Sequence, residues 1–234
     1  MAPAAHSVRE QVAWACRILA LEGYADLTLG HVSARPVGSD TVYIKRKGVA
    51  LHEVKPDDIV DVEDPTADLH LETVLHTAVY AERPDVGAVV HGHPPYTTAF
   101  GATNAHLELL THDAVLFANG ISVFDETAEL ITDLEQGRAV AEALGARRAV
   151  ILANHGVLVA EKDVRWAVLS ALTLERAVRL QAIASTLGEL RPMSKEVAER
   201  MFADKYQDRF VDEYWAAWIR RAQRAGADEG MPLA

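Results

Sequence analysis

The sequence of 234 residues contains a single cysteine, Cys16. One cysteine excludes an intramolecular disulfide and a zinc site built from several thiolates, and it is typical of proteins in a reducing cytosol. Any metal that this chain binds must therefore be held by nitrogen and oxygen atoms.

Positive charge is also scarce, since 23 Lys and Arg residues stand against 34 Asp and Glu residues and give a formal net charge of -11. Such a surface repels a phosphate backbone, and no basic stripe interleaved with aromatic residues offsets it. No uninterrupted apolar run reaches the roughly 18 residues of a membrane span, and residues 1–6 lack the pattern of a secretory leader. We therefore expect an unprocessed, cytoplasmic protein that binds neither nucleic acid nor membrane.

Half of the residues are apolar, which at this length is enough for one sizeable core. No internal repeat and no low-complexity linker divides the chain. We expect a single domain over residues 1–234, with its core over about 7–224 and a loose tail over 226–234.

The expected elements mix helices and strands. A capping box at Ser7-Val8-Arg9-Glu10 begins a first helix, which Gly23 ends. Three short segments rich in Val, Ile, Thr and Tyr are predicted to form a strand meander over 27–33, 41–45 and 59–63. Further helices are predicted over about 69–81, 127–144, 163–187 and 194–224, with a pair of strands over about 149–160.

Two histidines one residue apart end the apolar segment Val86-Gly87-Ala88-Val89-Val90-His91-Gly92-His93-Pro94. Successive side chains of a strand point to opposite faces, so this spacing puts His91 and His93 on the same side. Neutral imidazoles are preferred ligands for zinc and its neighbours in the first transition row. The pair therefore predicts half of a metal site.

A second polar interruption offers a third ligand. The triplet Asn154-His155-Gly156 breaks an apolar strand; glycine permits a sharp turn, and Asn can hold the histidine ring or nearby backbone. The alternative is that His155 is a histidine satisfied by hydrogen bonds inside a turn.

An acidic residue, Glu72, lies near the start of the helix before the histidine strand. It is either part of the same site or a solvated first-turn glutamate that favours the helix dipole. His76 is four residues farther on and would share a helix face with Glu72, and we expect it to have a structural role.

The order of these motifs, together with Leu29-Gly30-His31-Val32-Ser33-Ala34-Arg35 upstream, resembles the class II aldolase and adducin-head family over about residues 7–220. The resemblance implies an α/β fold, a three-layer α/β/α sandwich with a mainly antiparallel central sheet. It also implies a homotetramer with active sites between subunits. The residue roles that it implies are a divalent cation on His91, His93 and His155, and an acid/base at Glu72.

Such a site has a defined chemistry. Three neutral ligands leave the metal its positive charge and an open position, where a substrate can chelate. The electron pair left by carbon–carbon cleavage becomes an enediolate stabilised by the metal, and Glu72 beside it can transfer a proton. We expect zinc, with manganese as the second choice.

The departures from the family pattern concern the substrate. Sugar-phosphate members have Gly-Asn where this chain has Gly30-His31, and paired serines before the acidic residue where it has His70-Leu71. Their Thr-Pro-Ser-Gly-like loop is replaced by Lys45, Arg46, Lys47 and Gly48. These cations can bind an anionic substrate, or they can belong to a charged edge strand that discourages aggregation. Arg35 is expected to be structural.

The acid that protonates a leaving group is also altered, because the tyrosine that follows a histidine near His112 in sugar-phosphate aldolases is Asp113 here. Tyr206 or Tyr214 could supply a hydroxyl from the last helix, with His112 and His31 as alternatives.

The sequence therefore predicts a divalent-metal-dependent carbon–carbon lyase for a small anionic substrate, favoured as a decarboxylase of a hydroxylated carboxylic acid. Three alternatives stay open. They are a class II aldolase acting on a hydroxy-carbonyl or sugar-phosphate substrate, a metal-dependent epimerase, and an adducin-like interaction domain without catalysis.

Overall fold

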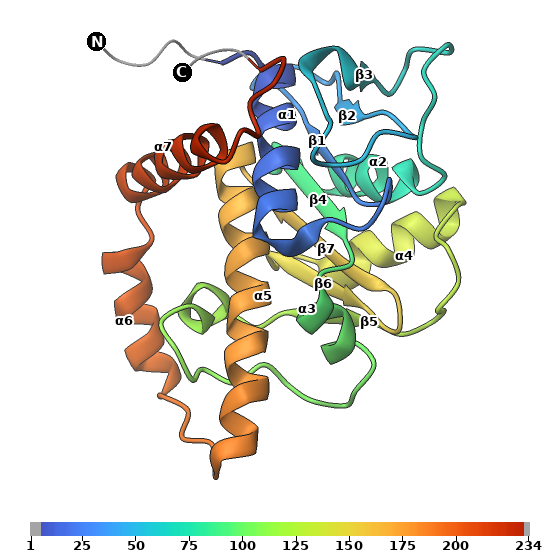
Figure 1. Ribbon diagram of the computed structural model, residues 1–234. Helices are drawn as coiled ribbons and strands as arrows, with labels where there is room; N and C mark the ends of the chain where they lie inside the picture. The colour runs from blue at the N-terminus through green and yellow to red at the C-terminus, as the bar shows by residue number, and fades with distance from the viewer. Residues whose placement is uncertain (1–5, 232–234) are drawn as a thin grey trace.

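A seven-stranded sheet with the strand order β3-β2-β1-β4-β7-β6-β5 forms the middle layer of the computed structural model, which describes residues 6–231 (Figure 1). Neighbouring strands are antiparallel except β5 and β6. This confirms the α/β class with a mainly antiparallel sheet. Residues 1–5, where no leader is expected, and the end of the expected tail at 232–234 lie outside the described residues.

The strands are β1 (His31–Ala34), β2 (Tyr43–Lys45), β3 (Ile59–Asp61), β4 (Ala88–Gly92), β5 (Ser122–Phe124), β6 (Ala149–Leu152) and β7 (Gly156–Glu161). The α-helices are α1 (Val8–Leu19), α2 (Thr73–Glu82), α3 (Pro95–Phe100), α4 (Leu134–Leu144), α5 (Val164–Leu187), α6 (Lys195–Lys205) and α7 (Asp208–Arg224).

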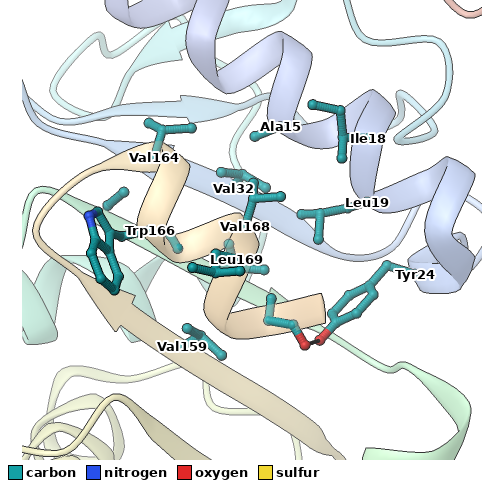
Figure 2. Close-up of a cluster of buried hydrophobic side chains, with 14 of the residues drawn as sticks. Ala15, Ile18, Leu19, Tyr24, Val32, Val159, Val164, Trp166, Val168 and Leu169 are labelled. Carbon is teal, nitrogen blue, oxygen red and sulfur yellow. Dashed lines mark hydrogen bonds between the residues drawn. The ribbon is translucent and has the colours of Figure 1, made fainter. Parts of the chain in front are cut away.

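Helices cover both faces of the sheet, with α1 and α5 on one face and α2 and α4 on the other (Figure 1). Figure 2 shows the first of these layers, where Val32 of β1 and Val159 of β7 pack with Val168 of α5. Because side chains alternate along a strand, the neighbours of Val32 in β1, His31 and Ser33, face the α2 layer. The sheet thus carries an apolar side and, at β1, a polar one.

The predicted capping box at the start of α1 is confirmed. The backbone N–H of Glu10 donates to Ser7 Oγ, and the backbone N–H of Ser7 donates to Glu10 Oε2 at 2.6 Å. The three N-terminal strands form the predicted antiparallel meander, although β1 begins only at His31 because Leu27 adopts a left-handed backbone with φ of 49°.

Three helix predictions need correction. The segment 194–224 is two helices, because Tyr206 leaves the helical backbone and its hydroxyl donates to the carbonyl of His112 at 3.0 Å. The helix expected from 127 begins at Leu134, where Asp133 accepts from the backbone of Gln136 as an N-cap. Helix α2 begins at Thr73 rather than at 69. The short elements α3 and β5 were not predicted.

The described part of the C-terminal tail is held in place, against the expectation of a loose tail from 226. The buried guanidinium of Arg17 donates to the carbonyls of Ala227 and Glu229 at 3.1 and 2.9 Å. Met231 is also buried. Among residues 6–231, no helix is both long and apolar enough to cross a membrane.

Candidate metal centre

Three histidines meet at one end of the sheet. His91 lies in β4, His93 follows that strand directly, and His155 lies in the turn between β6 and β7. The ring centroids are 5.0 Å apart for His91 and His93, 5.2 Å for His91 and His155, and 5.3 Å for His93 and His155. One ring nitrogen of each lies within 4.8 Å of the others, so the three predicted ligands are close enough to share one cation.

The antiparallel pairing of β4 with β7 brings these histidines together, since it sets Gly92 opposite Val157. The intervening turn depends on two residues. Asn154 adopts the left-handed region with φ of 58°, which Asn tolerates better than most residues. A Cβ on Gly156 would lie 2.6 Å from both the Gly92 carbonyl oxygen and His93 Cδ2. Glycine is therefore needed for close approach, while Asn154 makes the turn.

The second nitrogens of two of the rings are held by hydrogen bonds. His91 Nδ1 is 3.1 Å from the carbonyl of Val157, so it carries the proton and donates. His93 Nδ1 is 3.0 Å from Asp26 Oδ2. Burial and the neighbouring His91 lower the pKa of His93. This arrangement leaves the Nε2 lone pairs available, as outer-shell partners do in metal sites.

Two of the Nε2 atoms are buried and have no hydrogen-bond partner among the described residues, those of His91 and His155. Buried polar atoms without a partner are rare. A divalent cation that accepts both lone pairs would satisfy them, so the residues fit a metal ion. His91, His93 and His155 therefore form a group that could hold a divalent metal.

The carboxylate of Glu72 lies beside this set. Glu72 is buried just before α2, with Oε2 3.5 Å from His91 Nε2 and Oε1 3.5 Å from His155 Nε2. The backbone N–H of Ile131 donates to Oε1 at 3.1 Å. Burial disfavours the carboxylate, but the neighbouring His155 and His91 outweigh burial and hold the pKa of Glu72 below its usual range. The alternative of a solvated first-turn glutamate is wrong.

His31 lies next to the ligands because it is the cross-strand partner of His91 in the β1–β4 register. Gly30, with φ of 71°, turns the chain into β1 at this point. One ring nitrogen of His31, one of His91 and a carboxylate oxygen of Glu72 all lie within 4.8 Å of one another. His76 makes a 2.6 Å hydrogen bond to His31, as its expected structural role requires.

The predicted basic loop divides into three environments. Lys45 is fully buried, and its Nζ donates to the carbonyls of Thr28 and Val49 and to His70 Nε2, at 3.1, 2.7 and 3.1 Å, and more weakly to its neighbour's carbonyl at 3.3 Å. Burial lowers the pKa of Lys45. The ring of His70 is 4.5 Å from that of His31, so Lys45 adjoins the histidine cluster.

The remaining loop residues point elsewhere. Arg46 pairs with Asp58 at 2.8 Å, while Lys47 and Gly48 are exposed. Strand β2 lies between β3 and β1, so the alternative interpretation of this segment as an edge strand is wrong. Arg35 is structural as expected, because its guanidinium donates to four backbone carbonyls around the end of α2.

The other candidate acids lie apart from the metal-centre residues, by which we mean His91, His93, His155 and Glu72. Tyr206 and Tyr214 line a hollow of about 840 Å³ with Tyr96 and Asp113, and none of the four metal-centre residues lines it. His112 is exposed, and its carbonyl accepts the Tyr206 hydroxyl. Burial raises the pKa of Tyr206. Two residues that line the hollow, Pro95 and Tyr96, follow His93 closely in the chain.

Two residues that support His93 were not predicted. Asp26 binds its ring, and Glu175 of α5 accepts from the backbone N–H groups of Tyr96 and Thr97 at 2.9 and 2.7 Å. Glu175 thereby fixes the start of α3, directly after His93. No spacing links either acid to His93, and α3 is too short to show a helical period.

Comparisons with known proteins agree with this geometry. The Class II Aldolase and Adducin N-terminal domain family matches residues 10–182. A 3,4-dihydroxyphthalate decarboxylase of Arthrobacter keyseri is 30% identical over 206 residues, which cover 80% of this chain and 82% of the relative. An L-fuculose phosphate aldolase of Methanococcus maripaludis strain C5 is 30% identical over 182 residues, 74% of this chain and 95% of the relative. The crystal structure of an aldolase II superfamily protein from Pseudomonas syringae superposes with a TM-score of 0.83 at 27% identity, covering 94% of each chain.

Proposed function

Because the chain belongs to the class II aldolase and adducin N-terminal domain family, we propose that it is a divalent-metal-dependent carbon–carbon lyase that decarboxylates a hydroxylated carboxylic acid. One observation carries the proposal. Two imidazole nitrogens, on His91 and His155, are buried, have no hydrogen-bond partner in the part of the chain that the structure describes, and face the carboxylate of Glu72.

His91, His93 and His155 would hold the cation, and we propose zinc, with manganese second. Three imidazoles suit zinc, and three protein ligands leave one position open for a substrate. When bound, the cation supplies a positive charge beside a substrate oxygen, which stabilises the negative charge that develops as the carbon–carbon bond breaks.

Glu72 moves the proton in this proposal. Its Oε1 is held by the N–H of Ile131, which leaves Oε2 as the proton-carrying oxygen. The carboxylate accepts a proton from a substrate hydroxyl, carbon dioxide departs, and Oε2 returns the proton to the carbon that lost the carboxyl group. The hydroxyl oxygen then regains a proton from water, so the net change is replacement of carboxylate by hydrogen.

An anionic substrate is supported by the buried cation beside the site. None of the four described contacts of Lys45 Nζ is a carboxylate, so its charge is not neutralised by a direct partner. The small-hydroxyl loop and paired serines of the sugar-phosphate members are absent from this chain. A carboxylate is therefore favoured over a phosphate ester, in agreement with the decarboxylase relative.

Aldol cleavage is the second candidate, because the L-fuculose phosphate aldolase relative is matched over 95% of its length. Epimerisation by a metal-dependent route has no specific observation in its favour. A non-catalytic interaction domain is less well supported, since it would have no use for two buried, unpaired ligand nitrogens.

We further propose a homotetramer in which a neighbouring subunit completes the site. The hollow lined by Tyr96 and Tyr214 supports this, since both tyrosines are exposed there and Tyr96 belongs to α3, which begins two residues after His93. Light scattering of the purified full chain should give four times the 25.5 kDa mass.

Products separate the two lyase reactions. The zinc-loaded protein is incubated separately with 3,4-dihydroxyphthalate and with L-fuculose 1-phosphate, and carbon dioxide and aldehyde are measured. Carbon dioxide from the first substrate alone supports decarboxylation, whereas aldehyde from the second alone supports an aldolase. Glu72→Gln should keep its zinc and lose at least ~100-fold in rate. Zinc-loaded protein that forms neither product would contradict both reactions for these substrates.

A further inference from the structure

A chain of four buried side chains runs from the metal centre into the α2 layer. His31 Nδ1 is 2.6 Å from His76 Nε2, His76 Nδ1 is 2.6 Å from Ser33 Oγ, and Ser33 Oγ is 2.9 Å from the Tyr80 hydroxyl. All four residues are at most 5% exposed. The metal-binding and acid/base roles described above use none of these hydrogen bonds.

The side-chain periodicities of a strand and of a helix bring these residues together. His31 and Ser33 are two residues apart on one face of β1, which spans about 6.6 Å. His76 and Tyr80 are four residues apart on one face of α2, which spans about 6 Å. The strand pair and the helix pair therefore interleave, and this explains why Ser33 meets both residues of α2.

The four hydrogen-bonded side chains allow only a few placements of their protons. The rings of His31 and His76 are both buried, and neither makes a hydrogen bond to a carboxylate of the described residues that would offset a positive charge, so each ring is neutral and carries one proton. His76 uses both nitrogens in hydrogen bonds, so one must donate and the other accept. Only two arrangements satisfy this condition, and they run in opposite directions along the chain.

The hydroxyl end distinguishes the two arrangements. In the first, Tyr80 donates to Ser33, Ser33 donates to His76 Nδ1, and His76 Nε2–H donates to His31 Nδ1. Every proton from Tyr80 to His76 then has an acceptor. The remaining N–H, at His31 Nε2, belongs to the residue beside Glu72 and His91, and this atom is not among the buried polar atoms that lack a partner. In the reverse arrangement the Tyr80 proton needs another acceptor, but among residues 6–231 the only acceptor that meets its hydroxyl is Ser33 Oγ. A buried hydroxyl proton without an acceptor is costly, so the first arrangement is favoured.

We propose that Ser33, backed by Tyr80, is a positioning residue that acts through His76 to hold His31 as a neutral imidazole with its proton on Nε2. His31 Nε2 has no hydrogen-bond partner among the described residues, and His31 lies beside Glu72 and His91. It therefore presents an N–H donor to the metal centre. If the proposed function holds, this donor binds a carboxylate oxygen of the substrate.

The chain orients His31 and does not deliver protons. Its far end is Tyr80, which is buried and whose pKa is raised by that burial. Tyr80 thus cannot pass a proton from solvent along the four hydrogen-bonded side chains. A proton lost from His31 would have to be replaced from the metal centre itself.

Histidine tautomers can be read directly by NMR. The full chain is labelled with ¹⁵N in histidine only, and long-range ¹H–¹⁵N correlations show which ring nitrogen of His31 and His76 carries the proton. Signals are assigned with the variants His31→Gln and His76→Gln. The expected result is protonated Nε2 on both residues, without metal and with zinc. A proton on His31 Nδ1 would overturn the inference.

Two variants that each remove one buried oxygen provide the matched comparison. Ser33→Ala removes the hydroxyl that donates to His76, so His31 should show a second signal set with its proton on Nδ1. Tyr80→Phe leaves the Ser33 hydroxyl with His76 as its acceptor, so the single Nε2–H form should persist. Equal spectra for His31 in both variants would contradict the positioning role, because general loss of packing would affect both.

Zinc titration of the same samples keeps this inference separate from the proposed function. If the wild type binds no zinc but has the expected tautomers, the lyase proposal fails and the positioning of His31 stands. If it binds zinc and His31 carries its proton on Nδ1, only the positioning of His31 fails.

Discussion

Ionisable groups are buried at both ends of β7, but they are fully hydrogen-bonded at only one of them. At the far end, Glu161 accepts from the guanidinium of Arg148 and from Ser170 Oγ, the latter at 2.6 Å. That guanidinium also lies over the rings of Trp166 and Phe202, at 5.5 and 5.3 Å. At the near end, beside Gly156, the Nε2 atoms of His91 and His155 have no hydrogen-bond partner within residues 6–231.

The difference separates structural from functional burial. A buried charge that only stabilises the fold is matched by hydrogen bonds and an opposite charge, because an unmatched one would be destabilising. At the histidine end two acceptors are unpaired among the described residues, which is destabilising, and a bound cation would pair both of them. The same strand therefore offers a fully paired end for comparison with an open one.

The largest effect is expected from His155→Ala on zinc affinity. Removing one of three ligands should weaken binding by at least ~1,000-fold, since outer-shell partners alone contribute about 10–100-fold. Calorimetric titration of the metal-free protein measures this. The matched control is Arg148→Leu at the paired end, which should keep wild-type affinity. Unchanged zinc affinity in folded His155→Ala would remove His155 from the site.

The paired end should matter for stability instead. Arg148→Leu leaves Glu161 buried without its counter-charge and should lower the free energy of unfolding by ~3 kcal/mol, measured by urea denaturation. Lys162→Ala is the control, because its ion pair with Asp208 is exposed on both sides and should contribute at most ~1 kcal/mol. Equal decreases in the free energy of unfolding of the two variants would show that burial does not determine how much an ion pair stabilises the fold.

Gly156→Ala tests the close approach of β7 to the histidine strand. The added Cβ would lie 2.6 Å from the Gly92 carbonyl and from the His93 ring, which should cost about 1–3 kcal/mol and also weaken zinc binding. Gly38→Ala is the control, with a left-handed φ of 76° but open space around it. It should cost about 1 kcal/mol and leave zinc affinity unchanged. A Gly156→Ala protein with normal zinc affinity would mean that the turn can relax without moving His93.

Asp26→Ala should reduce zinc affinity about tenfold by releasing the His93 ring, with little change in folding. The control is Asp40→Ala, which removes an exposed aspartate. If Asp26→Ala binds zinc as the wild type does, the 3.0 Å hydrogen bond to His93 does not orient the ligand.

The smallest effect concerns pH at the paired end. Burial raises the pKa of Glu161, so the folded state holds this proton more tightly than the unfolded chain. The stability from that proton is present at low pH and is lost as pH rises through the folded pKa. Without Arg148 the pKa rises further, so the deficit of Arg148→Leu relative to wild type should be about 1 kcal/mol smaller at pH 5 than at pH 7. Adding Glu161→Gln should abolish this pH dependence.

The sequence was sufficient for the histidine motifs because their chemistry depends on short spacings. A strand period of two explains His91 and His93, and an interrupted apolar strand marks His155. Glu72 was identified through its position relative to a helix. The fold class was implied by the resemblance of these motifs, in their order, to a known family, and the sheet confirms it.

Other features depend on contacts between distant segments and left no local signal. Asp26 reaches His93 across 67 positions and Glu175 reaches Thr97 across 78. The loop from Lys45 read as one basic cluster, yet β-sheet pairing buries Lys45, and its neighbour Arg46 turns to Asp58. Burial of Tyr206 similarly divides a segment whose helical period looked continuous.

The most direct test of the central claim is the anomalous scattering of a crystal of the full chain soaked in zinc. We expect one strong peak at the end of β4, about 2.0–2.1 Å from Nε2 of His91, His93 and His155, with Glu72 beside it. A structure with zinc bound only elsewhere, or with the two buried nitrogens hydrogen-bonded to water in its place, would contradict the claim.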